Sequence, residues 1–526
     1  MQTPFRILFI KPHLSTYGIE YLEIPTAFLY LSAYLKAYIT EPVEIKLVDL
    51  RLEKNPSRAL QKILYQYQPN LIGITLLTHD QVFITRWMGF LRTLAPEAFF
   101  VAGGPGATYG CGALLQNSDL DCVVLGEGER VFLNLVTCLA GGQSFKRIRG
   151  VAYLEDGRVI KNSREPYIED MDTIPMPDYG LIDPKLYQGF LKPLMNVVSV
   201  HKKRILVVSS RACPYQCVYC HSIFGKKVRY RSPEHFVREI AYLYHEHGIR
   251  EFHIVDDIFN LHRDRMRQIL NMIIDSGMKI KLAFPNGLRG DLLEPADILL
   301  MKKAGAYQLT FAIETASPRI QRFIKKNLDL EKVIQNIAFA RKHGVLTRGF
   351  FMLGFPGETV QEIQKTISFA LQSKLHLANF FIVVPYRGTE LARMAETISP
   401  AFFSSSIAAE AQFYTKKSFY HMTTGYDLSK IQLQAFLRFY LRWPFLTTII
   451  RFPIRRSLLR WPKSFIEAFV PLPFRKKKQT PKGPKGSGYT MIDGLFVDED
   501  SSVDMRDMGR LEKDPVAVDA DDQIVA

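Results

Sequence analysis

Cys213, Cys217 and Cys220 lie within eight residues of one another, which is a spacing that lets three thiolates converge on one metal centre. Soft sulfur ligands suit iron–sulfur clusters or zinc. Zinc would need a fourth ligand, and His221 follows Cys220 too closely for the usual finger spacing. Three cysteines on a cubane cluster leave one iron without a protein ligand. The spacing therefore favours a metal centre over three unrelated buried thiols.

These cysteines follow the first strand of a series in which short apolar strands alternate with helical patterns. Six β/α units in about 180 residues are too many for a small sheet and too few for a closed eight-stranded barrel. We therefore expect an open partial barrel with active-site groups at the carboxyl ends of its strands. The expected strands are 205–209, 251–255, 279–284, 307–313, 347–353 and 377–384, and the helices include 233–247, 263–276, 330–343 and 359–373.

An earlier alternating series spans residues 5–140 and predicts a doubly wound parallel sheet with helices on both faces. Ligands of such sheets bind beyond the carboxyl ends of the strands, where glycine lets the backbone approach closely. Two loops occupy that place, and tight strand-to-helix turns explain them equally well. The loops contain Gly103, Gly104 and Gly106, then Gly126 and Glu127; the expected strands are 5–10, 43–50, 71–75, 99–102 and 122–125, with helices over 57–67 and 83–94.

The cysteine spacing, with Tyr219 just before the last cysteine, resembles the signature of the radical S-adenosylmethionine (SAM) superfamily, whose fold is a partial barrel. The resemblance covers residues 200–400. It implies a [4Fe–4S] cluster held by Cys213, Cys217 and Cys220, whose open iron chelates the amino and carboxylate groups of SAM. Electron transfer from the cluster would then cleave SAM to a 5′-deoxyadenosyl radical.

Polar residues that end the later strands are further candidates for cofactor binding. Many members carry a Gly-Gly-Glu stretch after the second strand, where this chain has Asp256 and Asp257. Carboxylates there can still accept from an ammonium group, although a surface turn explains them equally well. Glu314 closes an apolar strand, where burial without a partner is costly, so we expect it to face the site. The other candidates are Tyr219, Asn286 and Arg289.

The glycine loops and the preceding sheet make the chain similar to the cobalamin-binding branch of the superfamily, over residues 1–450. This implies cobalamin bound at the two loops. Many cobalamin proteins bind cobalt from below through a histidine in Asp-x-His-x-x-Gly, and His13 stands in that place without the Asp or the Gly. Because a metal-bound histidine needs a partner to fix its ring, we expect cobalamin without a histidine below cobalt.

Three other cysteines could in principle hold a second cluster, as in methylthio-transferring members of the superfamily. Cys122 falls in a predicted strand and Cys138 in a predicted helix, and Cys111 lies in the same domain. Their positions favour buried thiols instead.

Of the 526 residues, 47% are hydrophobic and 23% charged, which excludes a wholly disordered chain and a polytopic membrane protein. The net charge of +16 is uneven: residues 438–478 hold eleven basic residues and one acidic residue, and residues 479–526 hold five basic and eleven acidic residues. Residues 438–478, the basic block, also contain aromatic residues of the kind found at membrane interfaces, and this combination suits an anionic membrane surface. The prolines of the block interrupt any long amphipathic helix and favour instead a helical cap over the barrel. No nucleic-acid-binding motif is recognisable.

The expected organisation is a cobalamin-binding Rossmann-like domain, a linker, a radical SAM core, a helical extension and a disordered acidic tail. We expect a cytoplasmic enzyme, because the amino terminus shows no leader. The resemblance implies methylation of an unactivated carbon through a 5′-deoxyadenosyl radical and methylcobalamin. There are two alternatives: a cyclase or rearrangement enzyme like the anaerobic tetrapyrrole ring-forming members, and a non-catalytic corrinoid or redox-binding module. Partners would be a small-molecule or lipid-like substrate and an electron donor such as flavodoxin or ferredoxin. The expected boundaries are 1–165, 166–200, 201–400, 401–475 and 476–526.

Overall fold

The computed structural model describes residues 3–12, 22–188, 198–398, 400 and 426–442, together with the backbone of 489–492 and 495–498. Two units divide the chain, Met1–Pro471 and Leu472–Ala526. In the second unit, β16 (Tyr489–Ile492) and β17 (Leu495–Asp498) form an antiparallel hairpin. The rest of the expected acidic tail lies outside the described residues.

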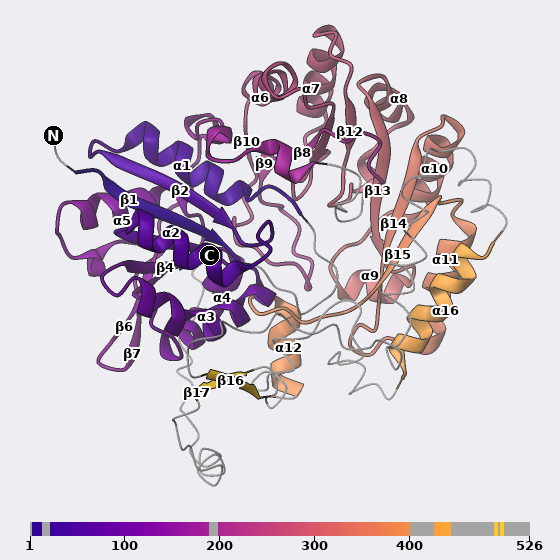
Figure 1. Cartoon of the computed structure of the whole chain (residues 1–526). Helices are drawn as coiled ribbons and strands as arrows, with labels where there is room; N and C mark the ends of the chain where they lie inside the picture. The colour runs from indigo at the N-terminus through magenta and orange to yellow at the C-terminus, as the bar shows by residue number, and fades with distance from the viewer. Residues whose placement is uncertain are drawn as a thin grey trace. The chain divides into compact units, whose positions relative to one another are not determined.

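The first half of the first unit is the doubly wound sheet that the sequence predicts (Figure 1). Its five parallel strands have the order β2-β1-β3-β4-β5. Helices α1 (Thr26–Tyr38) and α5 (Glu129–Ala140) bury their apolar residues against one face, and three helices cover the other. The strands are β1 (Phe5–Lys11), β2 (Val43–Asp49), β3 (Leu71–Thr75), β4 (Phe99–Gly103) and β5 (Cys122–Val124), and the three helices are α2 (Pro56–Tyr67), α3 (Gln81–Leu94) and α4 (Pro105–Gln116).

Two antiparallel strands that the sequence analysis did not predict extend this sheet. They are β6 (Val151–Glu155) and β7 (Arg158–Lys161), and they pair with each other and with β5. Asp156 and Gly157 join them with φ values of 48° and 74°. An Asp-Gly pair between two apolar runs is a strong hairpin signal, because both turn positions need positive φ.

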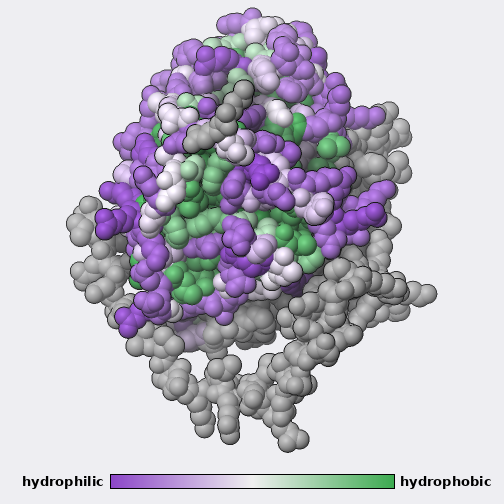
Figure 2. All heavy atoms as spheres, turned by 60° about the vertical axis from the view of Figure 1, so that its left-hand side comes forward, coloured by the Kyte–Doolittle hydropathy of each residue, from purple (hydrophilic) through white to green (hydrophobic). Residues whose placement is uncertain are grey.

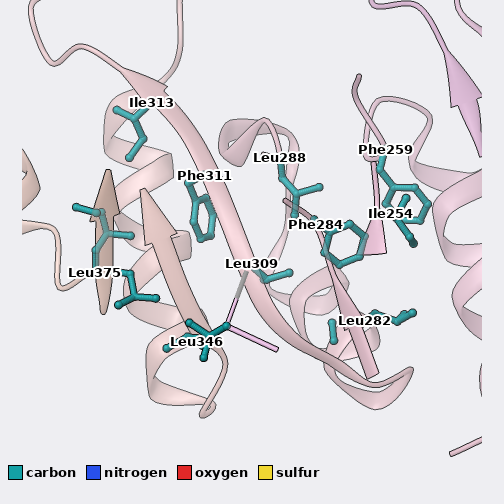
Figure 3. Close-up of a cluster of buried hydrophobic side chains, with 14 of the residues drawn as sticks. Ile254, Phe259, Leu282, Phe284, Leu288, Leu309, Phe311, Ile313, Leu346 and Leu375 are labelled. Carbon is teal, nitrogen blue, oxygen red and sulfur yellow. The ribbon is translucent and has the colours of Figure 1, made fainter. Parts of the chain in front are cut away.

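The second half is the partial barrel, with six parallel strands in the order β8-β11-β12-β13-β14-β15. Leu309 and Phe311 of β13 lie in a core that also contains Phe284, which packs 5.1 Å from Phe259 between ring centroids (Figure 3). The strands are β8 (Arg204–Val207), β11 (Glu251–Ile254), β12 (Lys281–Ala283), β13 (Ala306–Glu314), β14 (Leu346–Leu353) and β15 (Leu377–Ile382).

Amphipathic helices cover the outer side of these strands, and each expected helix is present within one or two residues of its predicted ends. Ile269, Ile298 and Ile337 from three of these helices join the same buried core. These helices are α6 (Pro233–Glu246), α7 (Arg263–Asp275), α8 (Pro295–Lys303), α10 (Leu330–Lys342) and α11 (Val360–Gln372). Two others, α9 (Pro318–Phe323) and α12 (Glu390–Ile398), lie beside Val218 of the cysteine loop, whose amide donates to the Ile324 carbonyl and whose carbonyl accepts from the Leu391 amide.

Only α16 (Leu428–Tyr440) is described from the expected helical extension over 401–475. Its Phe436 ring meets the Phe380 ring of β15 edge-on at 5.4 Å, and the Tyr440 hydroxyl donates to the Ala378 carbonyl at 2.7 Å. This helix therefore belongs to the barrel core. Most of the basic block over 438–478 lies outside the described residues.

Polar side chains cover most of the face in Figure 2, and apolar side chains gather in its middle. Within the described ranges, no helix is long and apolar enough to cross a membrane.

Candidate active site

The cysteine loop begins at the carboxyl end of the first barrel strand, where the sequence places it. After β8 the chain forms β9 (Ser210–Arg211), which pairs with β10 (Arg229–Tyr230), and the loop lies between these two strands. Cys213 and Cys217 are half-buried and Cys220 is exposed. Burial raises the pKa of the Cys213 thiol, and the nearby charges of Cys217 and Asp257 raise it further. Burial and like charges thus oppose the loss of the Cys213 proton, and a cationic iron cluster beside the loop would offset that cost.

A cubane cluster suits the three thiols of this loop, because thiolates are the usual protein ligands of iron–sulfur clusters. Within the described ranges, no three His, Cys, Asp or Glu side chains lie close enough to share one metal ion. In a cubane each thiolate binds a different iron, so the three ligands stand further apart than those of one ion. Cys213, Cys217 and Cys220 remain the proposed cluster ligands.

Side chains from the later strands hold the loop from the barrel side. The Arg289 guanidinium lies 4.0 Å from the Tyr215 ring centroid. Lys326 donates to the Tyr219 hydroxyl at 3.2 Å and to Glu314 at 2.8 Å. Glu314 therefore has a buried cationic partner, which removes much of the cost of burying its carboxylate. Sequence reasoning missed Lys326, because nothing in its local pattern distinguishes it from neighbouring lysines.

The two aspartates after β11 differ in their surroundings. Asp256 is 3% exposed and accepts hydrogen bonds from Ser209 and Ser210, including the Ser209 hydroxyl at 2.5 Å. Both of its carboxylate oxygens therefore bind neighbouring protein groups. Asp257 accepts one bond, from the Ala212 amide at 3.0 Å, and burial raises its pKa. Asn286 donates to the Val255 carbonyl at 2.6 Å. Asp257 is thus the better placed of the two for binding a cofactor.

A cavity of about 350 Å³ lies at the carboxyl edge of the first sheet and reaches the cysteine loop. Gly103, Gly104, Gly126 and Glu127, which the sequence analysis gives as cofactor-binding candidates, line it. The half of the unit that contains the partial barrel contributes Ser210, Arg211, His221, Phe224 and Asp257 to the same lining. Residues beside the cysteine loop and residues at the edge of the first sheet therefore share one cavity.

The predicted glycines have different roles. Gly126 has φ +81°, and a Cβ there would meet nothing within 4 Å, so its backbone faces open space. Gly104, with φ +90°, packs against the backbone of Leu76. Gly106 does not line the cavity; a Cβ at Gly106 would lie 2.3 Å from the Leu77 carbonyl oxygen. Close packing of α4 therefore accounts for Gly106, and we do not assign it a cofactor contact.

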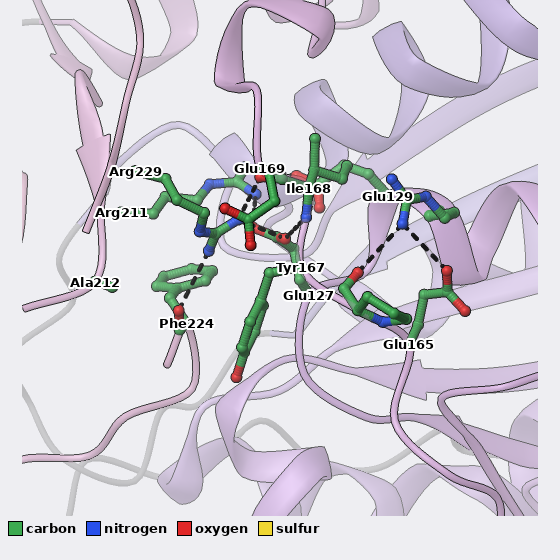
Figure 4. A network of polar contacts seen from close by, with 12 residues as sticks. Glu127, Glu129, Glu165, Tyr167, Ile168, Glu169, Arg211, Ala212, Phe224 and Arg229 are labelled. Carbon is green, nitrogen blue, oxygen red and sulfur yellow. Dashed lines mark hydrogen bonds and ion pairs between the residues drawn. The ribbon is translucent and has the colours of Figure 1, made fainter. Parts of the chain in front are cut away.

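Glu127 lies in a buried ion-pair network that joins the two halves of the unit (Figure 4). Its carboxylate accepts hydrogen bonds from Arg211, from Arg229 at 2.9 Å and from the Ile168 amide at 3.0 Å. Arg211 also pairs with Glu129 at 2.5 Å. Burial alone would raise the pKa of Glu127, but the two arginines hold it below its ordinary value. Glu127 thus contributes to the cavity wall and to the contact between the domains.

The stretch expected as a linker over 166–200 contacts both halves of the unit. Asp178 accepts from Ser32 of α1 at 2.6 Å. Tyr179 donates to Glu239 of α6 at 2.5 Å. The segment therefore ties the two halves together.

Two predictions concern residues outside this site. Cys111 and Cys122 are buried and Cys138 is half-buried, each in a helix or strand of the first domain, as expected for structural thiols. His13 lies outside the described residues, so the expectation about cobalt ligation stays a prediction.

Two family models match the chain, B12 binding domain over residues 18–136 and Radical SAM superfamily over 207–370. An uncharacterised methyltransferase of Pyrococcus horikoshii is 31% identical over 413 residues, which are 78% of this chain and 87% of the relative. The chain belongs to the cobalamin-dependent radical SAM family. Its cofactors are accordingly a [4Fe–4S] cluster, SAM and cobalamin, and it is an enzyme.

Other members of this family differ in reaction. The cytidylyl-2-hydroxyethylphosphonate methyltransferase of Streptomyces wedmorensis is 31% identical, covering 63% of this chain and 67% of that protein. The anaerobic magnesium-protoporphyrin IX monomethyl ester cyclase of Rubrivivax gelatinosus is 26% identical, covering 73% and 69%. The radical SAM methyltransferase TsrM from Kitasatospora setae, solved with cobalamin and a [4Fe–4S] cluster, shares the fold with a TM-score of 0.60 at 17% identity, over 76% of this chain and 79% of TsrM.

Glu358, after β14, gives a prediction about pH. Its Oε2 accepts from the amides of Gly354 at 2.7 Å and Phe355 at 3.0 Å, and its Oε1 has no partner in the described part of the chain. Burial raises its pKa to about 7. The folded protein then keeps this proton while the unfolded chain loses it, so stability falls as pH rises from about 4.5 to about 7. We expect the wild-type protein to lose about 2 kcal/mol more unfolding free energy than Glu358→Gln between pH 5 and pH 8. Denaturant unfolding of both proteins measures the difference, and an identical pH dependence would contradict it.

Proposed function

We propose that the enzyme methylates an unactivated carbon, in the space between the cysteine loop and the carboxyl edge of the first sheet. The observation that carries the proposal is the shared cavity, whose lining comes from the cobalamin-type domain and from residues beside the cysteine loop. A reactive carbon radical has to be held near its methyl source and away from water, and a site enclosed between two domains provides both conditions.

The proposed roles follow from position. Cys213, Cys217 and Cys220 would hold the cluster, and Asp257 and Glu314 would face SAM, with Tyr219, Asn286 and Arg289 keeping the surrounding loops in place. Gly103, Gly104 and Gly126 would let the corrin approach the sheet edge. When bound, the cluster and SAM supply a 5′-deoxyadenosyl radical, and cobalamin supplies the methyl group.

The overall reaction fixes the measurable products. Each methylation consumes two molecules of SAM and two electrons from an external donor such as flavodoxin or ferredoxin. One SAM gives up its methyl group and leaves as S-adenosylhomocysteine. The other breaks its bond between sulfur and C5′, leaves methionine, and takes the hydrogen from the substrate carbon to become 5′-deoxyadenosine.

Product analysis with added cobalamin and a reductant tests the proposal. We expect S-adenosylhomocysteine and 5′-deoxyadenosine in equal amounts, with one methyl group gained per substrate. A substrate that forms a ring without gaining a methyl group, accompanied by 5′-deoxyadenosine alone, would instead support the cyclase reaction named for some relatives.

A lipid-like substrate and peripheral membrane contact through the basic block stay proposals, because the block lies mostly outside the described residues. Flotation with anionic liposomes, comparing the full chain with a chain that ends at Arg442, tests them. The shortened chain keeps α16, which packs on the barrel core. We expect the full chain to float more, and equal flotation would remove the membrane role.

A further inference from the structure

Arg211 joins the cysteine loop to the wall of the cobalamin domain. It lies two residues before Cys213, and its side chain is 7% exposed. One guanidinium nitrogen donates to Glu127 and another donates to Glu129 at 2.5 Å. Both glutamates belong to the stretch after β5 that lines the cavity. A single planar group therefore spans the gap between a cavity-lining loop and the start of the cysteine loop.

Two aromatic rings also flank the Arg211 guanidinium. The Tyr30 ring centroid lies 5.4 Å from its central carbon, and the Phe224 ring centroid lies 5.3 Å away. Two carboxylates and two aromatic faces thus fix one group. A lysine could keep the charge but could not donate to two carboxylates in a fixed plane.

The other end of the cysteine loop is also held from outside the barrel. The Tyr167 hydroxyl donates to the Ile223 carbonyl at 3.1 Å. Arg229, which pairs with Glu127, donates to the Phe224 carbonyl at 3.3 Å. Contacts with the first domain and its connecting segment therefore lie before Cys213 and after Cys220.

We propose that Arg211 is a positioning residue that fixes the separation between cobalamin and the iron–sulfur cluster. The inference rests on the proposed placement of cobalamin in the cavity, and it concerns the coupling of the two cofactors. Arg211 would contribute little to binding either cofactor alone. Its loss would let the Gly126–Glu127 loop and the cysteine loop move relative to each other.

Pulsed electron paramagnetic resonance on the holoenzyme tests this inference, with cob(II)alamin and the reduced cluster as the two spin probes. We expect a narrow distance distribution in the wild-type protein and a broader one in Arg211→Lys, with both proteins reconstituted to the same iron and cobalamin content. Formation of S-adenosylhomocysteine should fall roughly 10²-fold, since a displacement near 1 Å has effects of that size. Formation of 5′-deoxyadenosine without substrate, which needs the cluster, SAM and a reductant but not cobalamin, should stay unchanged.

Arg130→Lys is the matched control, because Arg130 pairs with Glu165 at 3.2 Å and does not line the cavity. It should behave as the wild-type protein. If Arg211→Lys fails to fold, Glu129→Gln removes one carboxylate, leaves Glu127 paired, and should broaden the distribution in the same way. An unchanged narrow distribution in either folded variant would overturn the inference. A wild-type enzyme that makes no S-adenosylhomocysteine would refute the proposed methylation instead, and the distance measurement would still decide the role of Arg211.

Discussion

Cys217→Ala should yield a colourless protein that no longer cleaves SAM, whereas the wild-type protein should be brown, oxygen-sensitive and carry about four irons per chain. The reason is that Cys217 is the middle member of the only three-cysteine cluster in the sequence. With two protein thiolates left, a cubane would have two irons without protein ligands. Iron and sulfide analysis after anaerobic reconstitution, together with an assay for 5′-deoxyadenosine, measures the loss.

Cys138→Ala is the control for this change. Cys138 is a half-buried thiol in α5, outside the cysteine loop, so the variant should keep its iron and its colour. Eight irons per wild-type chain would revive a second cluster in the first domain. Stoichiometric zinc without iron would contradict the whole assignment of the cysteine loop.

Gly103→Val should weaken cobalamin binding roughly 10- to 100-fold while leaving the cluster intact. Gly103 is the last residue of β4 and lines the cavity, and its nearest neighbour to an added Cβ is Val124 at an ordinary 3.9 Å. The strand can therefore accept the Cβ, and the two methyl groups of valine would occupy space that we assign to the corrin. Overpacking of this kind costs about 1–3 kcal/mol, which corresponds to the stated loss of affinity.

Absorbance titration of the reconstituted protein with hydroxocobalamin measures this affinity. Gly112→Val is the matched control, since Gly112 lies in α4, meets nothing within 4 Å of an added Cβ and does not line the cavity. It should bind cobalamin as the wild-type protein does. Equal affinity for Gly103→Val and the wild-type protein would place cobalamin elsewhere.

Most elements of the two sheets could be predicted from the sequence, because each strand and helix carries its own local pattern. Pro233–Glu246 shows the reason, with Ser232 accepting from the His235 amide at its start and buried residues on one face. The β6–β7 hairpin was missed although its Asp156-Gly157 turn was readable. The cysteine loop was predictable because its three cysteines are neighbours in the chain.

The remaining site residues depend on contacts between distant parts of the chain. Arg211 and Glu127 are 84 residues apart, and only the packing of the two domains brings them together. The position of Glu127 after a glycine that follows a strand predicts a cofactor contact, which stays a prediction. The structure adds that two arginines from the barrel half bind its carboxylate. Nothing in the sequence distinguishes Gly106 from the neighbouring glycines. The structure explains why a glycine is needed there, because a Cβ would lie 2.3 Å from the Leu77 carbonyl oxygen.

The central claim is that cobalamin and the cluster meet at the cavity between the sheet edge and the cysteine loop. A crystal of the holoenzyme, measured for anomalous scattering at the iron and cobalt edges, tests it most directly. We predict an iron peak beside Cys213, Cys217 and Cys220 and a cobalt peak inside the cavity lined by Gly103 and Gly126. A cobalt peak away from that cavity, or iron bound away from the three cysteines, would contradict the account.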